Sequence, residues 1–418
     1  MRNNVEIITI GDELLIGQVV DTNSAWMGKA LSENGFSVNQ ITSIPDDKSH
    51  ILTSIANAFN NADVVLLTGG LGPTNDDITK TSLCEFFCTE LVFDEPSYEN
   101  VKRIIHGMGK EMDNELNRQQ AMVPQACTPI INREGTAPIL WFERMDKVLV
   151  SLPGVPHEME CAMTNDVIPR LIEFFERPSI QQTTLIVHGY GESALALKIA
   201  NWEEQLPSPL KLAYLPQGSY VKLRISGEDS DKEALKRMID AEVEKLTTLL
   251  GNAIVAYEDI EPEKILTNLL KKKQLTIATA ESCTGGTIAT YLSKHPGSSS
   301  FYKGSVVSYC NEVKHNVLGV KEETLERVGA VSQETVEQMA QGVCKLMNTD
   351  IGISVSGIAG PDGGTDEQPV GTIWIAVSDA TQVVSKKLQL GNSSRSRNIE
   401  KAAIEAIFLA KEFAENKK

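Results

Sequence analysis

A serine at the junction of a predicted strand and a predicted helix is the first candidate for chemistry in this chain. Ser282 follows the apolar run 275–278, which is typical of a buried strand, and precedes 287–292, which predicts the start of a helix. Gly285 and Gly286 lie beside it. The hydroxyl at such a junction is exposed, and nearby backbone N–H groups can bind a phosphate or the oxyanion of an acyl-transfer step.

A serine at this position can also be a simple helix cap, because serine and threonine are preferred there. Thr284 offers the same cap, so Ser282 is not needed for it. A second polar cluster, 309–314, follows the strand-like run 304–308. Its Lys314 could serve as the base that activates a serine if burial lowered its pKa. An ordinary solvated lysine is the alternative, and the neighbouring His315 also stays open as a base.

Four sequence blocks in the last part of the chain form a specific pattern. They are 280–286 (AESCTGG), 309–314 (YCNEVK), 356–364 (SGIAGPDGG) and 369–372 (PVGT). Through these blocks, residues 258–415 resemble the CinA C-terminal domain, a family that includes nicotinamide mononucleotide (NMN) deamidases. The resemblance implies a Ser–Lys amidohydrolase of NAD salvage that needs no cofactor. It makes Ser282 the nucleophile, Lys314 its base, and Tyr309 an assisting residue bonded to Lys314 or Ser282.

The same resemblance implies a set of substrate contacts. Backbone N–H groups near 284–286 would stabilise the oxyanion. The family's next block reads Gly-Asp-Arg, three residues, then Arg; here 391–397 reads GNSSRSR, which keeps only the last arginine. The substrate-binding residues expected for this domain are Thr284, Gly285, Gly286, Gly357, Ala359, Gly360 and Arg397.

The first part of the chain alternates short apolar strands with helices. The predicted order is strand 5–10, helix 22–34, strand 37–44, helix 49–60 and strand 63–68. Such runs predict an α/β fold with a parallel sheet that is buried on both faces. Polar clusters follow the three strands at 12–13, 46–47 and 68–79. Sites in open α/β sheets lie beyond these strand ends.

The glycine-rich cluster at 68–79 is the strongest local signal in this half. Glycines let the backbone approach a phosphate closely, so Gly69, Gly70, Gly72 and Thr74 are expected to bind substrate. The adjacent Asp76 and Asp77 could hold a divalent cation. Alternatively, acidic residues in a first helical turn simply favour the helix dipole. The loop lacks the Gly-Lys-Ser/Thr ending of a Walker A motif.

Residues 5–170 resemble the molybdopterin-binding (MoaB/MogA-like) domain at the N-terminus of CinA proteins, through 11–15, 69–79, 135–138 and 152–159. The resemblance implies a metal-dependent ADP-ribose pyrophosphatase. Glu13, Asp76 and Asp77 would hold cobalt, manganese or magnesium, with potassium as a further ion. The chain departs from the family at Asp21, Gln119 and Ile139, and Gln119 replaces a lysine that would neutralise a diphosphate. The deamidase therefore ranks above the pyrophosphatase.

Between these regions the predicted order is strand, helix, strand, strand, helix over 182–250, which is similar to a KH fold. KH modules bind single-stranded nucleic acid through a Gly-x-x-Gly loop with basic neighbours, and this segment has no such loop. A spacer or dimer-building role is therefore the better prediction. The predicted domains are 1–175 (MoaB/MogA-like), 176–255 (KH-like α+β) and 256–418 (CinA C-terminal α/β domain).

Composition narrows the function classes. The 418 residues carry a net charge of −17, which disfavours a nucleic-acid partner. No run of about 18 apolar residues predicts a membrane span. Seven cysteines without a paired framework and the absence of a signal peptide predict a cytoplasmic protein. We expect a homodimer whose ligands are NMN and ADP-ribose. Two alternatives stay open: the pyrophosphatase is the main activity beside a relic C-terminal domain, or the chain is a non-enzymatic nucleotide-binding protein associated with competence.

Overall fold

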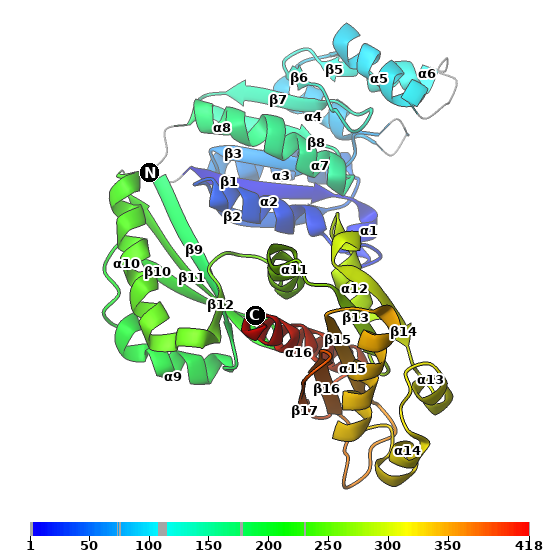
Figure 1. Ribbon diagram of the computed structural model, residues 1–418. Helices are drawn as coiled ribbons and strands as arrows, with labels where there is room; N and C mark the ends of the chain where they lie inside the picture. The colour runs from blue at the N-terminus through cyan, green and yellow to red at the C-terminus, as the bar shows by residue number, and fades with distance from the viewer. Residues whose placement is uncertain are drawn as a thin grey trace. The chain divides into compact units, whose positions relative to one another are not determined.

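The computed structural model describes residues 3–72, 74, 77–107, 115–175, 179–229 and 231–417. The chain forms two compact units, each of which is described separately: Met1–Gln182 with Ser226–Ile239, and Thr183–Ile225 with Asp240–Lys418. The predicted mixed α/β class is confirmed, and Figure 1 shows the strands and helices in chain order.

A six-stranded sheet forms the centre of the first unit, in the order β2-β1-β3-β8-β7-β6. Its strands are β1 (Asn4–Ile10), β2 (Ser37–Ile44), β3 (Val64–Thr68), β6 (Thr128–Ile130), β7 (Ile139–Arg144) and β8 (Lys147–Leu152). Strands β2, β1, β3 and β8 are parallel, and β7 and β6 continue the sheet antiparallel. The predicted parallel pairing of the first three strands is confirmed, and the predicted strand 37–44 coincides with β2.

Both faces of this sheet are covered by helices. The helices and short strands around it are α1 (Asp12–Leu15), α2 (Thr22–Glu33), α3 (Lys48–Asn61), α4 (Thr79–Phe87), β4 (Leu91–Phe93), α5 (Glu95–Gly107), α6 (Glu115–Gln120), β5 (Met122–Pro124), α7 (Pro156–Ala162), the π-helical turn Met163–Val167 and α8 (Ile168–Phe174). Alternate residues of one strand serve the two faces, because side chains in a strand point alternately to each side. Val5 and Ile7 pack with Leu31 of α2, whereas Ile8 packs with Ile55 of α3.

A smaller four-stranded sheet follows, in the order β10-β11-β9-β12, and its edge strand β12 is antiparallel to β9. Its elements are β9 (Ser179–His188), α9 (Glu192–Glu203), β10 (Lys211–Pro216), β11 (Tyr220–Asp229), α10 (Lys232–Leu250), the 3-10 turn Gly251–Ala253 and β12 (Ile254–Ala256). The predicted strand, helix, strand, strand, helix order is confirmed, and β12 is added at the edge. Trp202 of α9 donates to Glu242 of α10 at 2.8 Å, so a buried hydrogen bond joins the two helices.

The last sheet has five strands in the order β14-β13-β15-β16-β17. Its elements are α11 (Pro262–Lys273), β13 (Ile277–Glu281), α12 (Thr287–Ser293), the 3-10 turn Ser298–Ser300, β14 (Tyr302–Val307), α13 (Asn311–Asn316), α14 (Glu322–Val328), α15 (Gln333–Met347), β15 (Ile351–Gly357), β16 (Thr372–Ser378), β17 (Val383–Gln389) and α16 (Arg395–Asn416). β14, β13 and β15 are parallel. Their carboxyl ends therefore meet at one edge of the sheet.

The strand predicted from residue 275 begins two residues later, at Ile277. The reason is local: Leu275 still bonds back to Leu270 of α11, and Thr276 bonds the side chain of Asp350. The strand then extends through Glu281, which brings Ser282 directly to the strand end.

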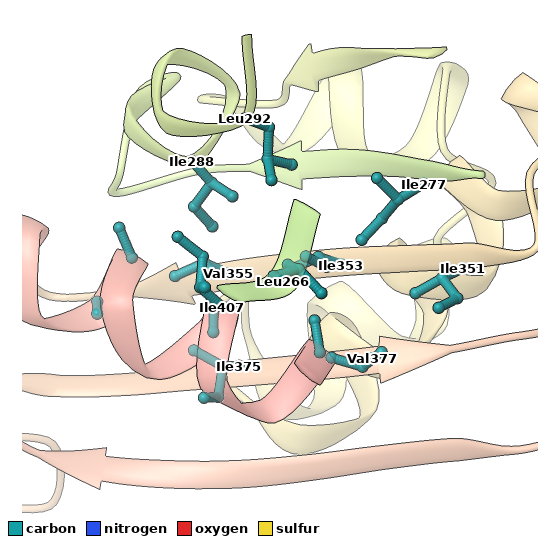
Figure 2. Packing of buried hydrophobic residues seen from close by; sticks show 14 of the residues in the cluster. Leu266, Ile277, Ile288, Leu292, Ile351, Ile353, Val355, Ile375, Val377 and Ile407 are labelled. Atoms are coloured by element: carbon teal, nitrogen blue, oxygen red, sulfur yellow. The ribbon is translucent and has the colours of Figure 1, made fainter. Parts of the chain in front are cut away.

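A buried apolar cluster on one face of this sheet fixes the strand ends in place. Figure 2 shows Ile277 of β13, Val355 of β15 and Ile375 of β16 lying against Leu266 and Ile407 of the covering helices α11 and α16. All of these side chains have no exposed surface. On the other face α15 packs against β13 and β16. Burial of this kind stabilises by about 25 cal/mol per Å² of apolar surface, so the packed cluster supports the strands that lead to Ser282.

In the part of the chain that the structure describes, no helix is long and apolar enough to cross a membrane.

Candidate active site

Ser282 is the first residue after β13, at the shared edge where β14, β13 and β15 end. Its N–H donates to the carbonyl of Val355 at 2.9 Å, which continues the sheet by one residue and fixes its backbone. The residue is 8% exposed. A hydroxyl in this position is shielded from bulk water while its backbone is anchored to the sheet.

Lys314 lies against that hydroxyl. Its Nζ is 3.0 Å from Ser282 Oγ and donates to the carbonyl of Ser308 at 2.6 Å. Lys314 is only 1% exposed, and burial lowers its pKa from the usual 10.5. The alternative of an ordinary solvated lysine is therefore wrong. His315 is directed elsewhere, since its Nδ1 is 2.8 Å from the carbonyl of Val320.

The carboxylate of Glu281, not Thr284, caps helix α12. Its oxygens accept from the N–H groups of Gly286, Ile288 and Ala289 at 3.0, 3.1 and 2.8 Å. Glu281 is fully buried, and its negative charge at a helix N-terminus is favourable. The expectation that Thr284 offers the cap is wrong, because Glu281 already occupies the donors that a threonine hydroxyl would meet.

Replacing Glu281 by alanine is expected to reduce the free energy of unfolding by about 3 kcal/mol, since it leaves three N–H donors without their acceptor. Urea unfolding followed by circular dichroism measures the change. Glu322→Ala is the matched control, because Glu322 is an exposed residue at the start of α14 and its loss should change little. A Glu281→Ala protein as stable as the control would show that this cap contributes nothing.

Some of the N–H groups expected to stabilise an oxyanion already have acceptors within the chain. Gly286 donates to Glu281 and Gly285 donates to the carbonyl of Ser282, so neither N–H is available. Among the described residues the N–H of Thr284 has no acceptor, and its hydroxyl, on a residue 3% exposed, has no partner either. Of the three residues expected to stabilise an oxyanion, Thr284 alone therefore offers free donors.

The thiol of Cys283, next to Ser282, is a second candidate nucleophile, but its protonation state argues against that role. Burial raises the pKa of its thiol to about 12, and the nearby positive charges of Arg395 and Lys314 act against that rise. A thiol with this pKa stays protonated near neutral pH, and the protonated form is a poor nucleophile. Ser282 is thus the better placed of the two.

Tyr309 does not bond Lys314 or Ser282, contrary to the expectation from the sequence. The residue is 63% exposed, and its hydroxyl accepts from Nη2 of Arg395 at 2.8 Å. Nη1 of the same arginine donates to the carbonyl of Gly360 at 2.8 Å. The physical reason is that the exposed phenol meets a cationic donor at the start of α16 instead of the buried amine.

Of the other residues expected to contact substrate, Gly357, Ala359 and Gly360 lie at the end of β15 and in the loop after it, and Arg397 lies on α16. A Cβ on Gly357 would lie 2.5 Å from Ile373, and one on Gly360 would lie 2.6 Å from Val370, so packing within the chain already requires both glycines. Ala359 is 2% exposed and its carbonyl accepts from Asn398. Arg397 is an exposed residue of α16, and none of the described hydrogen bonds uses its side chain.

Three of the four residues expected to bind substrate in the first unit line a cavity of 390 Å³ at the ends of β1 and β3. Gly69, Gly70 and Gly72 line it together with Glu13, Asp46, Asp77 and Glu158. Gly70 has a φ of +64°, and a Cβ there would lie 2.2 Å from Thr79 Oγ1, so only glycine fits this turn. Thr74 is not among the residues that line the cavity.

The described residues of this cavity do not fit a resident metal ion. Asp77 Oδ1 accepts from the N–H of Gly72 at 2.7 Å, and Oδ2 accepts from the N–H of Thr74 at 2.9 Å and from its hydroxyl. Asp77 thus shapes the loop. Asp76 lies outside the described residues, and within them no three His, Cys, Asp or Glu side chains gather as metal ligands. The contacts of these side chains therefore do not support a metal site made of Glu13 and Asp77.

Sequence patterns missed two residues that shape the C-terminal site. Glu281 was visible as a carboxylate just before a helix, a signal for an N-terminal cap. Arg395 was hidden, because its contacts lie 86 and 35 residues away along the chain.

Three family models match the chain, and together they span most of it. The CinA C-terminal domain matches residues 259–414, the probable molybdopterin binding domain matches 6–173, and the damage-inducible protein CinA KH domain matches 182–256. The resemblances stated from the sequence are thereby confirmed, as is the KH-like nature of the middle segment.

Whole-length relatives agree with these matches. The chain is 43% identical over 412 residues to a CinA-like protein of Flavobacterium psychrophilum, covering 98% of each chain. It is 44% identical over 406 residues to a CinA-like protein of Cytophaga hutchinsonii, covering 97% of each. A crystal structure of a competence or damage-inducible protein from Enterobacter asburiae is 34% identical, covers 37% of this chain and 96% of its own, and aligns with a TM-score of 0.36.

Proposed function

This chain belongs to the CinA family, and we propose that its C-terminal site hydrolyses the carboxamide of nicotinamide mononucleotide to give nicotinate mononucleotide and ammonia. One observation carries the proposal: Lys314 Nζ lies 3.0 Å from Ser282 Oγ, and both residues are buried. A serine needs a base within hydrogen-bond reach to become a nucleophile, and a lysine can be that base when it is desolvated.

The first half of the reaction forms an acyl-enzyme. Lys314, as the neutral amine, takes the proton of the Ser282 hydroxyl, and Oγ attacks the carboxamide carbon. The N–H and hydroxyl of Thr284 donate to the oxyanion. When the C–N bond breaks, Lys314 returns its proton to the nitrogen, which leaves as ammonia.

Water completes the reaction. Lys314 takes a proton from a water molecule, the hydroxide attacks the acyl carbon, and the bond to Ser282 Oγ breaks as the oxygen regains its proton. The carbonyl of Ser308, which accepts from Lys314 Nζ, orients the amine in both halves. None of these steps uses a metal ion.

The experiment that tests this proposal is product identification after incubation of NMN with the full chain. We expect nicotinate mononucleotide and ammonia in equal amounts. Release of free nicotinamide instead would show cleavage of the glycosidic bond and would remove the proposal. Tight NMN binding without any product would favour the non-enzymatic alternative.

A second candidate function is supported by the cavity in the first unit. Its 390 Å³ volume and its glycine turn suit a nucleotide diphosphate such as ADP-ribose. Buried Gln120 also lines it, and both polar atoms of its side chain lack a partner. A neutral amide of this kind can pair with a nucleobase edge, which offers a donor and an acceptor side by side.

Release of AMP from ADP-ribose, with and without added manganese, checks this second candidate. We expect cleavage by the parent protein and equal cleavage by Ser282→Ala, because the residue belongs to the other unit. The control for the cavity is Gln120→Ala, which should weaken turnover by about tenfold if the amide contacts the substrate. If no AMP were released either with or without manganese, this second function would be excluded.

A further inference from the structure

The cavity of the first unit has an acidic wall. Its lining includes four carboxylates, those of Glu13, Asp46, Asp77 and Glu158. Among the described lining residues there is no lysine, arginine or histidine. The hydrogen bonds that Asp77 and Glu158 accept come from neutral donors, for example from Nδ2 of Asn132 to Glu158, and a neutral donor leaves the negative charge in place. A ligand that enters this cavity therefore meets a negative surface.

Lys80 lies behind this wall and offsets only part of its charge. It is 7% exposed and is not among the lining residues, and its Nζ donates to the carbonyl of Gln120 at 2.8 Å. Its positive charge acts on Asp77, whereas Glu13 and Glu158 take part in none of the described ion pairs. Because the described side chains do not fit a resident metal ion, this wall favours a ligand that itself carries a positive group.

Two buried amides with unpaired atoms belong to the same region. Gln120 lines the cavity, is 2% exposed, and has no partner for Oε1 or Nε2. Asn23 is 9% exposed and lines an adjoining pocket of 110 Å³, which shares Glu13 and Gly154 with the cavity. Its Nδ2 donates to Thr68 and Gly154, so Oδ1 is the unpaired atom. Buried polar atoms normally have partners, so these atoms indicate a ligand that supplies hydrogen bonds.

Together these features describe a ligand with three parts. The glycine turn at Gly69 and Gly70 suits a diphosphate, as in the second candidate function, on which this inference rests. The acidic wall suits a cationic ring. The side-chain amide of Gln120 has both a donor and an acceptor and therefore complements a primary carboxamide. Oxidised nicotinamide carries both the ring charge and the carboxamide, and ADP-ribose carries neither.

We propose that the cavity of the first unit binds the oxidised nicotinamide dinucleotide NAD⁺ in preference to ADP-ribose, with the cationic ring at the acidic wall and the carboxamide at Gln120. Glu13 is the carboxylate to test, because it lines both the cavity and the adjoining pocket and none of the described hydrogen bonds uses its side chain. In this arrangement the two units of the chain recognise the same nicotinamide group at separate sites.

A comparison of NAD⁺ with NADH tests the role of the ring charge. The two ligands share adenine, diphosphate and carboxamide, and only the oxidised ring is cationic. Calorimetric titration of the full chain in the presence of a metal chelator measures both affinities without turnover and without added metal. We expect NAD⁺ to bind about tenfold more tightly than either NADH or ADP-ribose, since one favourable charge interaction at a partly exposed wall is of this size.

Two variants assign the contacts. Reduction also changes the shape of the ring, so Glu13→Gln is needed to attribute the preference to charge: the affinities for NAD⁺ and NADH should then lie within about threefold of each other. Gln120→Ala should weaken both dinucleotides by about tenfold, because both carry the carboxamide. Glu90→Gln is the matched control for Glu13→Gln. Glu90 is exposed in the same unit, lies outside the cavity lining, and makes no described side-chain contact, so the preference should persist.

Four results would overturn the inference: equal affinities for NAD⁺ and NADH, tighter binding of ADP-ribose than of NAD⁺ in the chelator, an unchanged preference in Glu13→Gln, or no binding of either dinucleotide. Failure of the second candidate function looks different. A protein that releases no AMP from ADP-ribose but binds NAD⁺ through Glu13 and Gln120 keeps the nicotinamide site and loses the pyrophosphatase reaction.

Discussion

Replacing Ser282 by alanine is expected to lower the rate of ammonia release from NMN by at least about 1,000-fold, because the variant has no oxygen to form the acyl-enzyme. The effect should appear in kcat. The fold should survive, since the hydrogen bond that anchors this residue to Val355 comes from the backbone N–H and not from the hydroxyl. Steady-state ammonia assays on the purified full chain measure the loss.

Ser293→Ala is the matched control for this variant. Ser293 is an exposed serine at the end of α12, and its hydroxyl bonds only within its own helix. It should retain the parent rate. If Ser282→Ala also turned over NMN at the parent rate, the nucleophile would have to be another group, and Cys283 would be examined first.

The second large effect is expected at Lys314. Lys314→Met should reduce kcat/KM by about 100- to 10,000-fold, the usual contribution of a general base. Burial lowers the pKa of Lys314, and the reaction needs its deprotonated form. The parent's activity should therefore increase as the pH rises through the lowered pKa of Lys314. The acidic part of the pH–rate profile should then reflect the titration of this lysine.

The pH profile is the decisive part of this prediction. The residual activity of Lys314→Met should lose the acid limb, because methionine does not titrate. Lys303→Met is the control, since Lys303 is an exposed lysine on the adjacent strand β14. If the pH–rate profile of Lys314→Met kept an unchanged acid limb, the titrating group would have to be a residue other than Lys314.

The apolar runs were sufficient to predict β1, β2 and β3 of the first sheet, whereas β6, β7 and β8 of the same sheet were not predicted. In β1, Val5 and Ile7 serve one face and Ile8 the other, a pattern that a parallel sheet between helix layers requires. Ser282 and Lys314 were also found from the sequence, because each follows a strand-like run and parallel strands end at one edge. The roles of these two residues came from the family resemblance and remain predictions.

Side-chain directions could not be predicted in the same way. Tyr309 was expected at Lys314 or Ser282, yet it bonds Arg395, which comes 86 residues later in the block 391–397, where the sequence pattern favoured Arg397. Thr284 was expected as the cap, yet the carboxylate of Glu281 takes the helix N–H groups. Both outcomes depend on long-range geometry and on competition between acceptors, which residue types alone do not fix.

The N-terminal glycine cluster shows a further limit of sequence patterns. The turn at Gly69 and Gly70 lines a cavity as expected, but Asp77 uses both carboxylate oxygens to hold Gly72 and Thr74. An acidic residue after a glycine loop can thus shape the loop instead of binding a metal ion.

The predicted domain boundaries and the homodimer also remain predictions.

The most direct measurement of the central claim is ammonia release from NMN in the presence of a metal chelator, by the parent chain, Ser282→Ala and Asp77→Ala. We expect sustained turnover by the parent and by Asp77→Ala, and none by Ser282→Ala. That result would place the deamidase in the C-terminal site and make it independent of the N-terminal cavity. No ammonia from the parent, or equal ammonia from the parent and Ser282→Ala, would contradict it.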